Sequence, residues 1–338
     1  MSTVKKYIYH PEIDFIRIIC IFSVIMIHTT TKILAVSGND LLNHPFTLFL
    51  NQLSRFAVPI FFMISAFGLK LNYSPDLKYL PYLKQRLSKI LLPYIFWSSI
   101  YYYFIYPHNS QSIFRVLLLG GASYQLYFIP ALFIFYLLFP LISRYFKFIN
   151  RTLPLIILFI IQFIFLILDY YYRPLSFAYP INVFILNFLF FILGILAGQY
   201  QSEIFDFVKK HKKIIISFSL ILAVYITVEG AFRYFKTQNY LSFYSQWRPS
   251  VLLYSISISS LLFYFGKNTK INPQFIKKLS CYSFFVYFIH IIFIEIIWKY
   301  LPHALLAPPL ISYFLVLIPS YLFAYLSSKI PRLSNLTG

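Results

Sequence analysis

The stretch IDFIRIICIFSVIMIHTTT, residues 13–31, decides the class of fold. Apolar side chains fill most of it, and a helix needs about 20 such residues to cross roughly 30 Å of hydrocarbon. The N-terminal sequence lacks a short apolar core followed by a small-residue cleavage site, so we expect this segment to be retained. It is predicted to form a transmembrane helix over residues 13–36.

The rest of the chain repeats this pattern. Of its 338 residues, 60% are hydrophobic and 11% are charged, which is too little polar surface to face water. The expected spans, ten with the first, then continue at residues 46–70, 87–106, 124–143, 152–172, 181–200, 213–232, 247–266, 280–299 and 305–328. The sequence therefore predicts an all-α integral membrane protein that forms a single polytopic domain over residues 1–338.

The basic residues indicate the orientation of these spans, because cytoplasmic loops hold the excess of Lys and Arg. With the N-terminus inside, 20 of the 29 Lys and Arg fall on the cytoplasmic side and 7 on the other side, while Arg17 and Arg55 lie in apolar context. Both termini are therefore expected in the cytoplasm. The net charge of +20 then reflects membrane orientation and does not indicate a nucleic-acid partner.

Several other kinds of site find little support. The 40 Phe and 31 Tyr are typical of packing and of the membrane interface, so binding of nucleic acid by base stacking is not expected. The sequence shows no metal-ligand cluster, no phosphate-binding glycine loop and no nucleophilic Ser/His/Asp pattern. No metal site is predicted.

Ionisable groups within the first span are costly in a membrane and are therefore functional candidates. Asp14 and Arg17 are three residues apart and can form an ion pair. Arg17 and His28 are eleven apart, a spacing that returns to nearly the same helix face about 16 Å further along. One face of this helix is thus predicted to carry a cation near one boundary and an imidazole deep in the membrane.

This arrangement suits a long ligand with anionic groups at one end and a reactive group at the other, such as an acyl-coenzyme A. Phosphates would bind near Arg17, and His28 would deprotonate an acceptor hydroxyl as a general base. The alternative is that His28 only forms a hydrogen bond to a neighbouring helix.

The spacing of Arg17 and His28 resembles the first-helix signature of acyltransferase family 3, the membrane enzymes that O-acylate bacterial surface and secreted carbohydrates. Four later blocks resemble that family in the same order, and they are SRFAVPIFFMISAF (54–67), KQRLSKILLPYIFW (84–97), QLYFIPALFIFYLLFPLI (125–142) and SCYSFFVYFIH (280–290). The first two blocks of the chain look most similar to the member proposed to O-acetylate enterobacterial common antigen. Ala66 departs from the pattern, since many relatives have Gly after the serine that corresponds to Ser65.

The resemblance implies a multi-pass enzyme of the bacterial cytoplasmic (inner) membrane that transfers an acyl group, most simply acetyl from acetyl-CoA, to a carbohydrate hydroxyl. It makes Arg17 and His28 the essential pair, supported by Asp14. Lys84 and Arg86 are candidates for binding the phosphates, although the positive-inside rule alone also explains both. The lipid bilayer and a carbohydrate acceptor are the expected partners, and the oligomeric state stays open.

The candidate acceptor-binding residues are Arg55, Ser65, Tyr127 and His290. Arg55 would stabilise an oxyanion or bind the acceptor, or it would only extend its charge to the interface. His290 would line the reaction chamber or form an interhelical hydrogen bond. The main rival function is a transporter or flippase for a polysaccharide or a lipid-linked sugar, and a membrane sensor is a third possibility.

Overall fold

The computed structural model describes residues 9–36, 44–73, 78–107, 111–172, 179–237 and 245–330. Within these ranges the regular structure is helical and contains no strand. Nine spans among the described residues are long and apolar enough to cross a membrane. The prediction of an all-α, multi-pass integral membrane protein is confirmed.

The helices are α1 (Pro11–Val36), α2 (Pro45–Leu53), α3 (Ala57–Asn72), α4 (Tyr79–Ile100), η2 (Tyr101–Ile105, a π-helical continuation of α4), α5 (Ile113–Leu119), α6 (Phe128–Ile149), α7 (Thr152–Tyr172), α8 (Pro180–Gln199), α9 (Gln201–Thr237), α11 (Pro249–Lys267), α12 (Pro273–Tyr300), α13 (His303–Leu306) and α14 (Pro309–Ser327).

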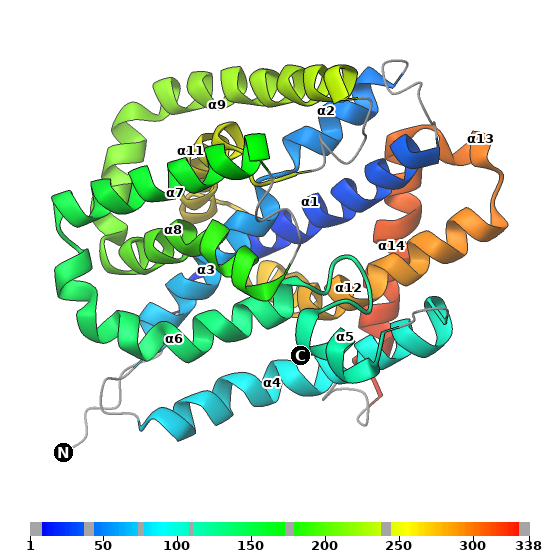
Figure 1. Ribbon diagram of the computed structural model, residues 1–338, viewed down its shortest axis with the longest axis horizontal. Helices are drawn as coiled ribbons and strands as arrows, with labels where there is room; N and C mark the ends of the chain where they lie inside the picture. The colour runs from blue at the N-terminus through cyan, green and yellow to red at the C-terminus, as the bar shows by residue number, and fades with distance from the viewer. Residues whose placement is uncertain are drawn as a thin grey trace.

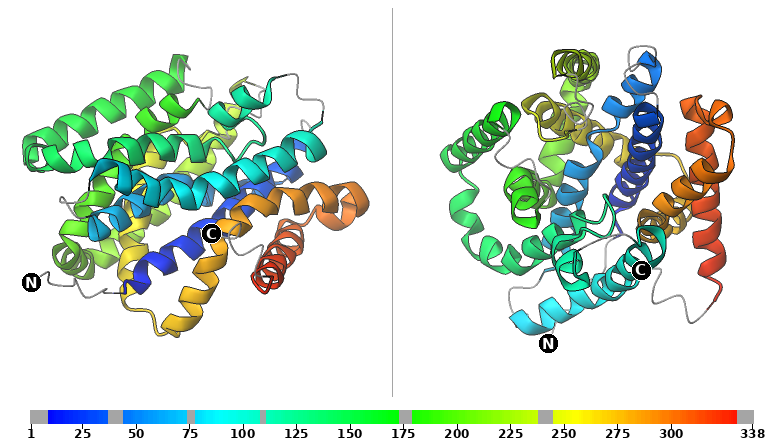
Figure 2. Two further views of the ribbon diagram at one scale, coloured as in Figure 1. Left: turned by 90° about the horizontal axis from the view of Figure 1, so that it is seen from below. Right: turned by 45° about the vertical axis from the view of Figure 1, so that its right-hand side comes forward.

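Helix α1 occupies the centre of the bundle and contacts α2, α3, α11, α12 and α14. Helices α4, α6, α7 and α9 lie around the outside in Figures 1 and 2. Cys20, Ile21 and Ile25 of α1 are fully buried, which agrees with this central position. A polar side chain on α1 therefore has to find its partners within the protein.

The second expected span is interrupted. Helix α2 ends at Leu53 and α3 begins at Ala57, with tighter backbone bonds from the Arg55 amide to the Gln52 carbonyl and from Ala57 to Ser54 between them. Pro59 explains the break, because it has no N–H to donate to the Arg55 carbonyl one turn earlier. The span expected at 46–70 is confirmed as one apolar segment, Pro45–Asn72, and the helix within it breaks at residues 54–56.

Two further boundaries differ from the sequence-based prediction. The segment expected at 213–232 belongs to a longer helix, α9, that begins at Gln201 and carries Lys209 and Lys213 on a helical extension. The segment expected at 87–106 corresponds to α4 and η2, which are not among the nine apolar spans. Basic residues and many aromatic residues lower the mean hydropathy of α4.

Helices α3 and α8 pack closely against each other, and Gly194 makes this approach possible. A Cβ atom at Gly194 would overlap the backbone carbonyl of Met63 and would also meet the Ala66 methyl group at 2.9 Å. Small residues allow helices to approach this closely in membranes. The glycine that permits this contact is therefore Gly194 on α8. The sequence analysis had instead drawn attention to Ala66 on α3.

Candidate functional site

Helices α1 and α12 lie side by side and parallel, and they bring the polar residues of both into one row. Arg17 contacts Ser280, His28 faces His290, and Lys32 contacts Glu295. Each partner lies 262 or 263 positions further along the chain, so the register stays constant over four turns. The row contains a cationic end, a pair of imidazoles and an ion pair, in that order.

At the cationic end, Arg17, Asp14 and Ser280 form a closed set of contacts. Arg17 Nη1 donates to Asp14 Oδ1 at 2.7 Å and to Ser280 Oγ at 2.8 Å, and Ser280 Oγ donates to Asp14 at 2.7 Å. These bonds use one nitrogen of the guanidinium. Since the Arg17 side chain is 39% exposed, its other nitrogens can still bind an anion.

A tyrosine of α6 lies near both Arg17 on α1 and Arg86 on α4. Tyr136 of α6 lies within electrostatic range of the Arg17 and Arg86 guanidinium groups. It also lies near the Ser65 hydroxyl on α3, which donates to the Phe61 carbonyl oxygen at 2.8 Å. Arg86 also faces the hydroxyl of Tyr82, which is almost completely buried. The Arg86 Nε atom and the Tyr82 hydroxyl have no hydrogen-bond partner among the described residues. Four helices thus converge on a cationic, incompletely satisfied site.

The imidazoles of His28 and His290 form the centre of the row. Their ring centroids are 5.3 Å apart. His290 is fully buried, and its Nδ1 atom is 3.0 Å from the Val286 carbonyl oxygen. His28 is only partly buried, and its ring also contacts Tyr124 at a centroid distance of 4.9 Å. His28 is therefore packed within the protein and does not face lipid alone.

Arg55 lies near His28, and Tyr127 lies near Arg55. The Arg55 guanidinium interacts electrostatically with His28 and with Tyr127. It is 5% exposed and donates through Nε to Asn51 Oδ1 at 3.1 Å. The Tyr127 hydroxyl accepts a bond of 2.8 Å from Gln246. A buried guanidinium therefore lies beside His28.

Beyond the imidazoles, the row ends in an ion pair that links α1 and α12. Lys32 Nζ is 3.0 Å from Glu295 Oε2, and the Tyr106 hydroxyl donates to Glu295 Oε1 at 3.3 Å. A phenol is protonated at neutral pH, so the Tyr106 hydroxyl can act as a hydrogen-bond donor.

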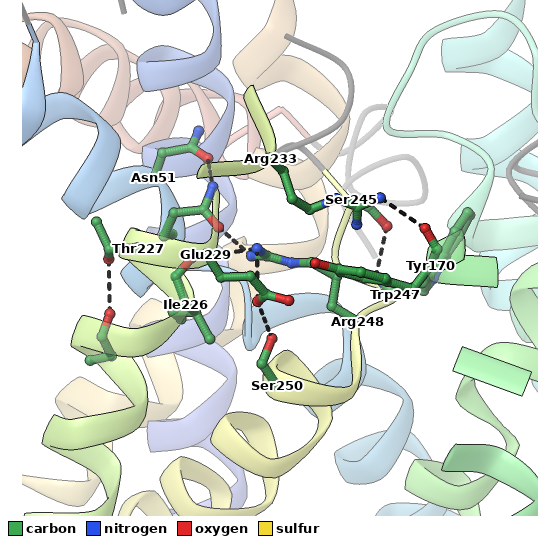
Figure 3. A network of polar contacts seen from close by, with 12 residues as sticks. Asn51, Tyr170, Ile226, Thr227, Glu229, Arg233, Ser245, Trp247, Arg248 and Ser250 are labelled. Carbon is green, nitrogen blue, oxygen red and sulfur yellow. Dashed lines mark hydrogen bonds and ion pairs between the residues drawn. The ribbon is translucent and has the colours of Figure 1, made fainter. Parts of the chain in front are cut away.

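A buried network supports Arg55 from the far side. Asn51 Oδ1 accepts from Arg55 and from Gln52, and Gln52 Oε1 accepts from Arg248. Arg248 is completely buried and forms an ion pair of 3.2 Å with Glu229. Figure 3 shows the Arg248 side chain at the centre of this network, with Glu229 and Ser250 beside it. The orientation of Arg55 thus depends on residues of α2, α9 and α11.

The structure brings together most of the candidates that the sequence offered. His290 and Arg55 lie near His28, and Tyr127 lies near Arg55. Ser65 lies near Tyr136 at the Arg17 end. Lys84 is exposed, and no contact places it in either group.

The sequence did not single out four residues that also line the row, namely Lys32, Tyr124, Tyr136 and Ser280. The sequence carried a usable signal for two of them. Lys32 is four residues after His28, and Ser280 is ten residues before His290, so helical spacing places both near the same stripe.

A family model described as an acyltransferase domain matches residues 10–329. The chain belongs to acyltransferase family 3. This match covers every helix described above and supports a membrane acyltransferase. The row formed by α1 and α12 is therefore the candidate active site of this member of the family.

Curated relatives of the chain carry a different kind of name. The chain is 27% identical over 309 residues to a "probable poly-beta-1,6-N-acetyl-D-glucosamine export protein" of Staphylococcus aureus (strain MSSA476), covering 86% of this chain and 83% of that protein. A protein of the same name from Staphylococcus epidermidis is 23% identical over 310 residues, with 86% and 82% covered. No solved structure matches the chain.

Proposed function

We propose that this protein transfers an acyl group, most simply acetyl, from acyl-CoA to a hydroxyl group of a cell-surface or secreted carbohydrate. The observation that carries the proposal is the parallel row on α1 and α12, with guanidinium groups at one end and paired imidazoles further along. A donor with a phosphate-rich head and a long arm ending in a thioester fits a row of this kind.

The cationic end has the chemistry of a phosphate site. Arg17 on α1 and Arg86 on α4 both lie within electrostatic range of Tyr136. Guanidinium groups bind phosphate through two parallel hydrogen bonds. Arg86 Nε and the Tyr82 hydroxyl are buried polar atoms with no partner among the described residues, and a bound phosphate would satisfy them. These features favour binding of the nucleotide part of coenzyme A there.

The imidazole end has the chemistry of acyl transfer. His28 takes the proton of the acceptor hydroxyl while its oxygen attacks the thioester carbonyl carbon. Arg55 stabilises the negative charge that develops on the carbonyl oxygen. The carbon–sulfur bond then breaks, and the departing thiolate receives the proton from His28. The products are an ester and free coenzyme A, so atoms and charge balance.

The acceptor and the cellular location follow from two further observations. The relatives' names refer to a polymer of N-acetylglucosamine, which is a hydroxyl-rich carbohydrate. The excess of Lys and Arg lies on the side of the bundle that carries Arg17 and Arg86, which favours a donor drawn from the cytoplasm across a bacterial inner membrane. Both termini would then be cytoplasmic.

The test uses the purified full chain in lipid nanodiscs with radiolabelled acetyl-CoA and a β-1,6-linked N-acetylglucosamine oligosaccharide. We expect label to enter the sugar with the parent protein. His28→Ala should abolish transfer, and Arg17→Ala should weaken acetyl-CoA binding. Full transfer by His28→Ala would refute the mechanism.

The relatives' names also favour a second function, which is export of a polysaccharide without chemical change. This function predicts movement of the labelled sugar across sealed vesicles with no consumption of acetyl-CoA. Mass spectrometry of surface carbohydrate from a deletion strain separates the two. Loss of an acetyl mass supports the enzyme, and unchanged acylation with less surface carbohydrate supports export.

A further inference from the structure

We propose that the acceptor is an uncharged sugar that binds where the row ends, on a surface formed by Lys32, Tyr106, Tyr124 and Glu295. We call these four residues the acceptor surface. This inference rests on the proposed function, since it assigns the acceptor of that reaction a class and a place.

The acceptor surface lies directly beyond the imidazoles. Lys32 is four residues after His28 on α1, and Glu295 is five residues after His290 on α12. At 1.5 Å per residue, these groups are about 6–8 Å further along the helix axes. A sugar bound to them has hydroxyl groups within reach of His28.

The same surface is open to the outside of the bundle. Tyr124 is 47% exposed although its ring contacts His28. The Lys32 and Glu295 side chains are 32% and 29% exposed. Tyr124 therefore contacts the His28 imidazole and is also exposed on the side from which a ligand would reach it. On the opposite side, His290 is fully buried and offers no such approach.

The chemistry of the surface matches a neutral saccharide. A carboxylate accepts hydrogen bonds from two hydroxyl groups, and an ammonium group and a phenol donate to others. A phenol ring also provides an apolar face for the C–H face of a pyranose. Lys32 and Glu295 already neutralise each other at 3.0 Å. An anionic or cationic ligand would have to compete with this pair, whereas an uncharged ligand leaves it intact.

Direct binding tests this assignment without requiring turnover. The probe is a fluorescent β-1,6-linked N-acetylglucosamine oligosaccharide, titrated onto the full chain in nanodiscs of uncharged lipid. We expect Glu295→Gln, Lys32→Met and Tyr124→Ala each to weaken binding at least tenfold, and Tyr124→Phe to stay within threefold of the parent. The matched control is Lys299→Met, which removes an exposed cation near the same end of α12 and should change binding less than twofold.

Acetyl-CoA binding, measured on the same samples, reports whether a variant is folded. Unchanged acetyl-CoA binding with lost sugar binding supports the acceptor surface. If Glu295→Gln or Lys32→Met also loses acetyl-CoA binding, Tyr124→Ala decides, because Tyr124 lies outside any helix and takes no part in the Lys32–Glu295 ion pair that joins α1 to α12.

Three results would overturn the inference. The first is that Tyr124→Ala and either charge variant bind the sugar as the parent does. The second is that the parent binds no sugar. The third is that the sugar is displaced when anionic phospholipid is added to the nanodisc. Failure of the acceptor surface and failure of the proposed function give different results. Sugar binding without any transfer of acetyl would refute the enzyme and leave the acceptor surface as a saccharide site.

Discussion

The imidazole rings of His28 and His290 face each other at a centroid distance of 5.3 Å, inclined by 35°. His290 Nδ1 lies 3.0 Å from the Val286 carbonyl oxygen, which can only accept, so Nδ1 carries the proton. His290 Nε2 is then an acceptor, and it is buried with no partner in the described part of the chain. This atom is available to stabilise the protonated form of His28.

His290→Ala should therefore lower the kcat of acyl transfer about 10²-fold and leave the KM for acetyl-CoA unchanged. His290→Gln, whose amide oxygen supplies an acceptor, should recover part of the loss and shift the pH dependence of kcat. Steady-state kinetics across pH measures both effects. His303→Ala is the control, because it removes an exposed imidazole of the chain and should leave kcat within twofold. Parent-like kcat in His290→Ala would reduce His290 to a packing residue.

Arg86→Ala should raise the Kd for acetyl-CoA by about 10- to 100-fold, because a hydrogen bond to a charged group contributes about 1.5–3 kcal/mol. Arg86→Lys should recover part of the affinity, since it keeps the charge and loses the paired donors. Isothermal titration with acetyl-CoA gives both values. Arg144→Ala removes an exposed arginine and is expected to bind as the parent does. If Arg86→Ala and Arg144→Ala lost acetyl-CoA affinity equally, the affinity would depend only on the total positive charge of the protein.

The sequence predicted the membrane class and one stripe of the site because both depend on local periodicity. Long apolar segments identify spans whatever their neighbours are, and the spacing of Arg17 and His28 follows from 3.6 residues per turn. The break at Arg55 also had a local signal, which is Pro59. The early start of α9 did not, because a charged helical extension beyond the membrane leaves hydropathy low.

The partners of Arg17 and His28 could not be predicted in the same way. Ser280 and His290 lie more than 260 positions away, and only the register of α12 against α1 brings them there. Tyr136 is one of 31 tyrosines and has no distinguishing neighbour in the sequence. Its place near two guanidinium groups depends on how α6 packs against α3 and α4.

Gly194→Ala should destabilise the bundle by about 1–3 kcal/mol, the usual range for overpacking a tight contact. A methyl group there would overlap the Met63 backbone carbonyl, which cannot move without displacing α3. Gly68→Ala is the matched control, since a Cβ at Gly68 meets nothing within 4 Å and alanine favours helix. Thermal unfolding in detergent should rank Gly194→Ala below the parent and Gly68→Ala at or above it. The reverse order would contradict the close approach of α3 and α8.

Glu229→Leu should destabilise the protein by about 3 kcal/mol or more, because it leaves the completely buried Arg248 without its countercharge. Combining it with Arg248→Met removes the unpaired charge, so the double variant should unfold at a higher temperature than Glu229→Leu alone. Recovery of stability need not restore activity. Loss of Arg248 also removes the bond to Gln52, which supports Asn51 and through it Arg55. We therefore expect the double variant to be folded but slow in acyl transfer, and parent-like activity would show that Arg55 is held without the network.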